Sequence, residues 1–64
     1  MTDAQILELA WNALMEGRTA DARAALEQST TPNVRAFARR CDPNQSHALR
    51  DDLVTYGRMI GVRW

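Results

Sequence analysis

One stretch in the second half of this chain combines a helix start signal, a helical apolar period and a helix stop signal. Asp42 can cap a helix, Pro43 suits the first helical position, and Gln45 stands where a capping-box partner belongs. Gly61 stands where a left-handed C-cap is expected. These signals predict a helix over residues 43–60, which is long for a chain of 64 residues.

Apolar residues recur through this stretch at steps of four, three, one and three, which places them on one stripe of a 3.6-residue helical turn. They are Leu49, Leu53, Tyr56, Gly57 and Ile60. Gly57 costs about 0.5–1 kcal/mol in a helix relative to alanine unless its missing side chain is used. We therefore expect another helix to approach closely at Gly57.

The first helix is predicted over residues 3–16, with Thr2 or Asp3 as its cap and Gly17 beyond its end. Its apolar side chains cover a face wider than one stripe. They are Ile6, Leu7, Leu9, Ala10, Trp11, Ala13, Leu14 and Met15. A small isolated domain cannot bury so wide a face, so we expect this helix to touch a second surface.

Two short helices are predicted between these, over residues 19–28 after the favourable N-cap Thr19, and over residues 32–40 with Thr31 as cap and Pro32 at the first position. The sequence therefore predicts one all-α domain over residues 1–64. We expect a compact bundle of about four short helices, in which a helical hairpin is followed by a short helix and a long C-terminal helix.

A domain of this size buries only about 60% of the surface that its unfolded chain exposes. Ten of its apolar residues are alanine, so few large side chains are available for a core. A dimer interface would supply further burial, and we expect a homodimer. The formal charge is zero, with a balance of −3 over residues 1–30 and +3 over residues 31–64. Strong attraction of the whole protein to nucleic acid or to a membrane is therefore not expected.

Every basic side chain is arginine, and with the high alanine content this is typical of a GC-rich bacterial or phage gene. The single cysteine, Cys41, cannot form an internal disulfide, and the chain does not begin with a charged and then apolar signal segment. The Gly57 and Gly61 pair has the spacing of a membrane-helix contact, but Arg58 lies between them and no apolar run of spanning length surrounds them. We expect a cytoplasmic protein.

The residues that carry enzyme chemistry are sparse. Ser46, His47 and Asp51 are close in sequence, but neighbouring side chains on a helix point about 100° apart, so the serine and histidine are not aimed at each other. A contact between His47 and Asp51, one turn apart, is the simpler interpretation. Cys41 and His47 are the only soft metal ligands, and the glycines are scattered. We predict no enzyme activity, no metal and no cofactor.

The run from Leu9 and Ala10 through Gly17 to Ala22 and Leu26 resembles one helical hairpin of the tetratricopeptide repeat. The resemblance implies two antiparallel helices packed through small side chains. No second repeat follows, and solenoids of this kind need about three repeats to be stable. We interpret the pattern as convergent packing of a hairpin.

A second resemblance gives an alternative function. Residues 37–50 resemble a helix-turn-helix, which implies DNA binding by the region 34–54, with the second helix in the major groove. The residues that would contact bases are Asn44, Gln45, His47 and Arg50. Asp42 and Pro43 replace the glycine that is usual in the turn, and Asp51 and Asp52 would face the phosphates and oppose binding.

Binding to another protein explains more of these features together. The wide apolar face of the first helix, the arginines near the end of the third and the last residue, Trp64, provide the aromatic and arginine anchors that dominate protein interfaces. We predict a small non-enzymatic protein-binding regulator or inhibitor. The predicted partner-binding residues are Trp11, Met15, Arg39, Arg40, Arg58 and Trp64.

Overall fold

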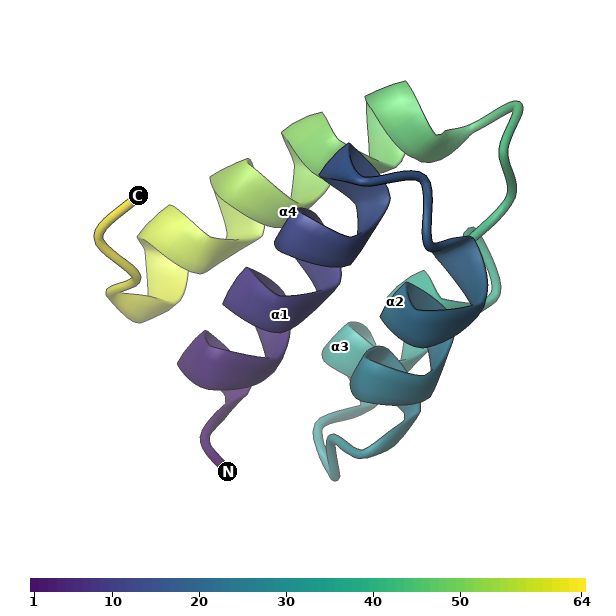
Figure 1. Ribbon diagram of the computed structural model, residues 1–64. Coiled ribbons are helices and arrows are strands. Elements are labelled where there is room, and N and C mark those ends of the chain that lie inside the picture. Colours follow the sequence, from purple (N-terminus) through teal and green to yellow (C-terminus); the bar gives the residue numbers. More distant parts are fainter.

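The computed structural model describes all 64 residues and contains four helices and no strands. The helices are α1 (Asp3–Met15), α2 (Thr19–Glu27), α3 (Pro32–Ala38) and α4 (Ser46–Ile60). Helix α1 packs between α2 and α4, and α3 packs against α2 (Figure 1). The predicted all-α bundle of four helices is confirmed. None of the helices combines the length and the apolar character needed to cross a membrane.

Both ends of α1 follow the sequence signals. The Thr2 hydroxyl accepts a hydrogen bond from the Gln5 amide at 3.2 Å, and the Gln5 side chain accepts one from the Thr2 amide at 2.9 Å. This reciprocal pair is a capping box. At the other end Gly17 has a φ of 78°, and the Arg18 amide donates to the Ala13 carbonyl at 2.8 Å. The left-handed residue thus closes the helix with the bonds of a Schellman motif.

The wide apolar face of α1 is shared between two neighbours within the chain, α2 and α4. Its buried residues are Ile6, Leu7, Ala10, Ala13 and Leu14. Trp11 is half-buried, with its ring centroid 5.8 Å from that of Trp64. Only Leu9 and Met15 leave about half of their surface exposed, at 48% and 51%. The expectation that an isolated domain cannot bury so wide a face was therefore largely wrong, because α4 and the segment that follows it cover the side of α1 that α2 leaves open.

Helix α4 begins at Ser46, so the prediction that it starts at residue 43 was wrong. The Asp42 side chain accepts from the Asn44 amide at 2.8 Å, and the Asp42 carbonyl accepts from the Gln45 amide at 2.9 Å. These two bonds form a separate turn. Gln45 then has a φ of −117°, and its side chain makes no capping hydrogen bond. An aspartate that starts a turn and one that starts a helix have the same local sequence signal.

The shorter helices also differ from the prediction at their ends. Thr19 is the first helical residue of α2 and not its cap, which is Arg18. Helix α3 ends at Ala38 instead of residue 40. The amides after it donate to carbonyls three residues earlier, which is the hydrogen-bond pattern of a tighter turn than the α-helix. Thr31 does precede α3, but its side chain makes no capping hydrogen bond, and its hydroxyl donates to Asp3.

The end of α4 carries the expected C-cap. Gly61 has a φ of 97°, and the buried Val62 donates its amide to the Gly57 carbonyl at 2.8 Å. The chain then turns back, so that the Trp64 indole lies on Gly57 and donates to the Val54 carbonyl at 3.1 Å. A Cβ atom on Gly57 would lie 2.6 Å from the indole nitrogen. The expected close approach therefore exists, but the neighbour is Trp64 and not another helix.

A polar cluster fastens the start of α1 to the connection between α2 and α3. Both hydroxyls, of Ser29 and Thr31, donate to the Asp3 carboxylate, the first at 2.6 Å. These bonds, that from Ser29 foremost, hold the pKa of Asp3 below its ordinary value. Ser29 is buried and also accepts from the Thr31 amide at 3.0 Å. The cluster thus satisfies the polar groups of a connection that leads directly into α3.

Candidate functional site

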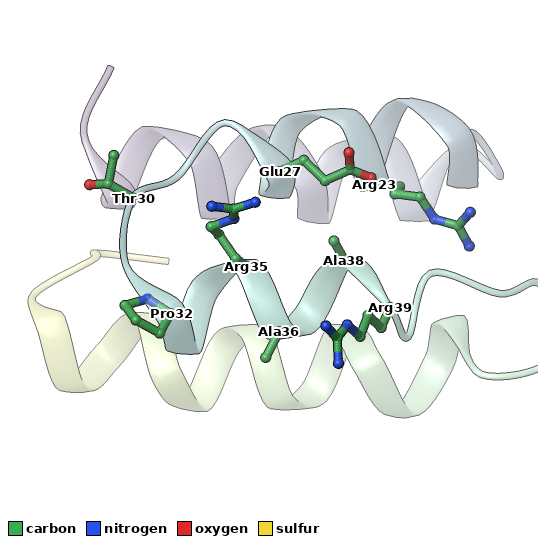
Figure 2. A pocket seen from close by; sticks show the side chains of 8 residues that line it. All are labelled: Arg23, Glu27, Thr30, Pro32, Arg35, Ala36, Ala38 and Arg39. Carbon is green, nitrogen blue, oxygen red and sulfur yellow. The ribbon is translucent and has the colours of Figure 1, made fainter.

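A groove of about 780 Å³ runs between α2 and α3 (Figure 2). The connection over residues 28–31 reverses the chain, so the two helices run antiparallel and form the two walls. Part of the lining consists of the small side chains of Pro32, Ala36 and Ala38. Longer side chains can therefore extend into the space between the walls. The lining residues are Arg23, Glu27, Thr30, Pro32, Arg35, Ala36, Ala38 and Arg39.

The charges of this groove follow helical spacing. Arg23 and Glu27 are one turn apart on α2, while Arg35 and Arg39 are one turn apart at α3 and its C-cap. Residues four apart share a face of a helix, about 6 Å apart along its axis. Each wall therefore presents two charged groups. Figure 2 shows the Glu27 carboxylate between the guanidinium groups of Arg35 and Arg23.

The three groove arginines take part in none of the ion pairs within the chain. Those pairs join Arg18 to Glu16 and Asp21, and Arg40 to Asp52. One guanidinium nitrogen of Arg23 donates to the Cys41 carbonyl at 3.0 Å, which holds that side chain in place. A planar guanidinium group matches the bidentate geometry of a carboxylate or phosphate.

The predicted arginine anchors do not form one cluster. Arg39 is exposed and lines the groove, whereas Arg40 is half-buried and bonds the Asp52 carboxylate of α4 at 2.6 Å. Both were predicted as partner-binding residues, but Arg40 is already paired within the chain. They diverge because α3 ends at Ala38, before either of them. Arg58 is exposed on α4, away from the groove lining.

The other predicted anchors lie along the contact between α1 and α4, which we term the α1–α4 seam and define by Trp11, Met15, Arg50, Gly57 and Trp64. Trp11 meets Trp64 near the end of α4, and Met15, one turn further along α1, contacts the Arg50 guanidinium near the start of α4. Trp64 keeps 41% of its surface exposed. The seam thus uses most of these side chains to join two helices.

The candidate base-contacting residues are divided between a turn and a helix. Asn44 and Gln45 precede α4, and only His47 and Arg50 lie on it. Arg50 donates to the His47 ring nitrogen Nδ1 at 2.8 Å, and its Nε is buried without a partner. The connection over residues 39–45 is longer than the roughly three- to four-residue turn of a helix-turn-helix. These residues do not form one outward-facing row at the start of a helix.

The remaining reactive side chains are also engaged or buried. His47 contacts Arg50, so the expected contact with Asp51 was wrong. Cys41 is buried, and burial raises the pKa of its thiol, which disfavours the reactive thiolate. No three His, Cys, Asp or Glu side chains are grouped where they could hold a metal ion.

The sequence prediction missed three residues of the groove, Arg23, Glu27 and Arg35. A signal for them existed in the four-residue spacing of Arg23 with Glu27 and of Arg35 with Arg39. What the sequence did not show was that these two pairs face each other. That requires the antiparallel packing of α2 on α3.

Comparison with models of protein families, with curated protein sequences and with solved structures finds no match for this chain.

Proposed function

We propose that this protein is a small non-enzymatic binding module that regulates another protein by holding an acidic segment of it in the groove between α2 and α3. One observation carries the proposal: three arginines from two helices line one groove, and none is in an ion pair with a carboxylate of the chain. Arginine clusters are a common means of recognising acidic protein motifs.

The charge distribution supports a protein ligand over nucleic acid. Binding to nucleic acid draws most of its strength from a continuous row of phosphate contacts. In this chain the Glu27 carboxylate interrupts the row of positive charges in the groove. The acidic Asp51 and Asp52 lie on α4 just after the candidate base-contacting residues. The groove also offers few apolar side chains, so it is less suited to the apolar face of an amphipathic helix than to a charged, extended segment.

A direct test uses a short peptide with blocked ends, Glu-Ser-Gln-Ser-Glu, and the matched neutral peptide Gln-Ser-Gln-Ser-Gln. We expect the acidic peptide to bind and the neutral one not to bind. The double variant Arg35→Gln with Arg39→Gln should weaken binding by roughly tenfold, which corresponds to about 1.4 kcal/mol. Affinity measured by titration calorimetry should also fall as salt is raised, because the groove is open to solvent.

The chain provides a matched control. Arg58 and Arg63 are both exposed and both outside the groove, so Arg58→Gln with Arg63→Gln removes the same charge. This control should bind the acidic peptide almost as tightly as the parent. An equal loss in both double variants would show that only net charge matters, and the proposed groove would be rejected. Affinity capture from a host extract with the parent and the groove variant would then identify the partner.

Self-association is a separate part of the proposal. Its support is the set of large apolar side chains left exposed, which are Met1, Leu9, Met15, Met59, Ile60 and Trp64. A second copy packed over part of this set would add the burial that a small alanine-rich core lacks. Sedimentation at tens of micromolar should then give twice the mass of the chain. A monomer at every dilution would contradict it.

A further inference from the structure

We infer that the groove selects acidic segments in which a basic residue stands between two acidic ones, with Glu27 as the residue that determines this specificity. The inference rests on the proposed function and names the chemistry of the ligand. It comes from the order of charges along the groove, where the Glu27 carboxylate lies between the Arg35 and Arg23 guanidinium groups (Figure 2).

The two ends of the groove are positive. Arg35 lies toward the end formed by the connection from α2 to α3, and Arg23 lies toward the other end, where it bonds the Cys41 carbonyl (Figure 2). Arg23 is held by its bond to the Cys41 carbonyl, so little side-chain freedom is lost when it binds a carboxylate. Each end can therefore accept one acidic side chain of a ligand.

The α2 wall is negative in the middle of the groove, where the Arg39 guanidinium lies on the α3 side (Figure 2). Glu27 is exposed, and it makes no ion pair with either flanking arginine. An acidic ligand residue placed opposite it would be repelled, and a lysine or arginine would be attracted. Glu27 thus opposes a uniformly charged ligand, such as a run of glutamates or a nucleic acid strand, in the centre of an otherwise positive site.

The spacing of the walls suits an extended peptide. Charged residues one turn apart on α2 or α3 lie about 6 Å apart along the helix axis. In an extended peptide, alternate side chains lie on the same side, about 6.6 Å apart. Three alternate residues can therefore lie opposite Arg35, Glu27 and Arg23. The matching ligand has the order acidic, basic, acidic at every second residue.

The test compares three blocked peptides that differ only at the centre: Glu-Ser-Lys-Ser-Glu, Glu-Ser-Gln-Ser-Glu and Glu-Ser-Glu-Ser-Glu. Attraction to net positive charge alone would make the peptide with three glutamates bind tightest. We expect the reverse order, with the central lysine peptide binding about three- to tenfold more tightly than the central glutamate peptide. The peptides are added to 15N-labelled protein, and dissociation constants are taken from NMR titrations, which measure weak binding.

The Glu27→Gln variant should invert this order and bind the central glutamate peptide tightest. The matched control Glu8→Gln removes an exposed glutamate of α1 outside the groove and should keep the order of the parent. If the parent binds the central glutamine peptide but ranks the others by net charge, the selectivity of Glu27 is refuted while the proposed function stands. If the parent binds none of the peptides, the proposed function fails. A ten-nucleotide thymidine strand that binds the parent more tightly than the lysine peptide would overturn the inference in favour of nucleic acid.

Discussion

The α1–α4 seam and the groove between α2 and α3 differ in how their polar groups are paired and in how their space is filled. In the seam, Trp64 covers Gly57, and its indole nitrogen bonds the Val54 carbonyl. In the groove, Arg35 and Arg39 line open space without a carboxylate partner in the chain. The seam thus pairs most of its groups within the chain, with the buried Arg50 Nε as the exception, whereas the groove keeps charged groups that an external ligand can pair with.

This difference predicts a division of roles between the two regions. Changes in the seam should alter the free energy of unfolding, since they disturb packing that the fold uses. Changes to the groove arginines should alter ligand binding and leave the free energy of unfolding nearly unchanged. The predictions below test each side of this division.

The largest effect is expected at Gly57. Gly57→Leu places a side chain where the Trp64 indole lies, so it should lower the free energy of unfolding by about 1–3 kcal/mol despite the better helix propensity of leucine. Denaturant unfolding followed by circular dichroism measures the change. In a Trp64→Ala background, Gly57→Ala should instead stabilise the helix by about 0.5–1 kcal/mol. A Gly57→Leu variant that melts above the parent would show that the indole does not pack there.

A pH-dependent effect on the free energy of unfolding is expected at Asp3, which holds the connection between α2 and α3. Because the folded pKa of Asp3 is depressed, its stabilisation is fully present above the ordinary aspartate value of about 4 and is lost as pH falls through the folded pKa. Asp3→Asn should therefore be less stable than the parent at neutral pH, and the two should converge in strong acid. Denaturant unfolding at several pH values measures the difference, and a difference that does not change with pH would contradict it.

A smaller effect is expected for the ion pair between Arg40 and Asp52, which joins the end of α3 to α4. Both side chains are partly exposed, at 38% and 52%, so the pair should contribute about 0.2–1 kcal/mol, and less at high salt. A double-mutant cycle with Arg40→Gln and Asp52→Asn measures the coupling. A loss of acidic-peptide binding in Arg40→Gln that matches the loss in Arg39→Gln would show that Arg40 belongs to the binding surface.

The smallest effect on stability is expected for Arg35→Gln with Arg39→Gln. Neither residue has an ion pair to lose, so the free energy of unfolding should change by less than about 0.5 kcal/mol. A loss above about 1 kcal/mol would show that the arginines stabilise the fold, and the contrast between groove and seam would disappear.

The sequence predicted the helices well where local signals decide the structure. Thr2, one of the two caps that the sequence allowed, and the left-handed glycines Gly17 and Gly61 act within a few residues, so the local pattern placed both ends of α1 and the end of α4. The start of α4 was wrong because Asp42 has two local options, a turn or a helix cap, with the same signature. Only the packing around the following turn decides between them.

The candidate site was less predictable because it depends on contacts between distant parts of the chain. Arg39 was among the predicted partner-binding residues, but the facing wall with Arg23 and Glu27 comes from another helix. In the same way, helical period alone could not show that Trp64 turns back onto Gly57. Such pairings are set by tertiary packing, which short-range patterns do not contain.

The most direct test of the central claim is to map where an acidic peptide binds on the parent protein. Backbone amide and arginine side-chain Nε signals are followed by NMR while the Glu-Ser-Lys-Ser-Glu peptide is added. We expect the largest shifts at Arg23, Glu27, Arg35 and Arg39, with little change along the α1–α4 seam. Shifts centred on Trp11 and Trp64, or on His47 and Arg50 at the start of α4, would contradict the assignment of the groove as the binding site.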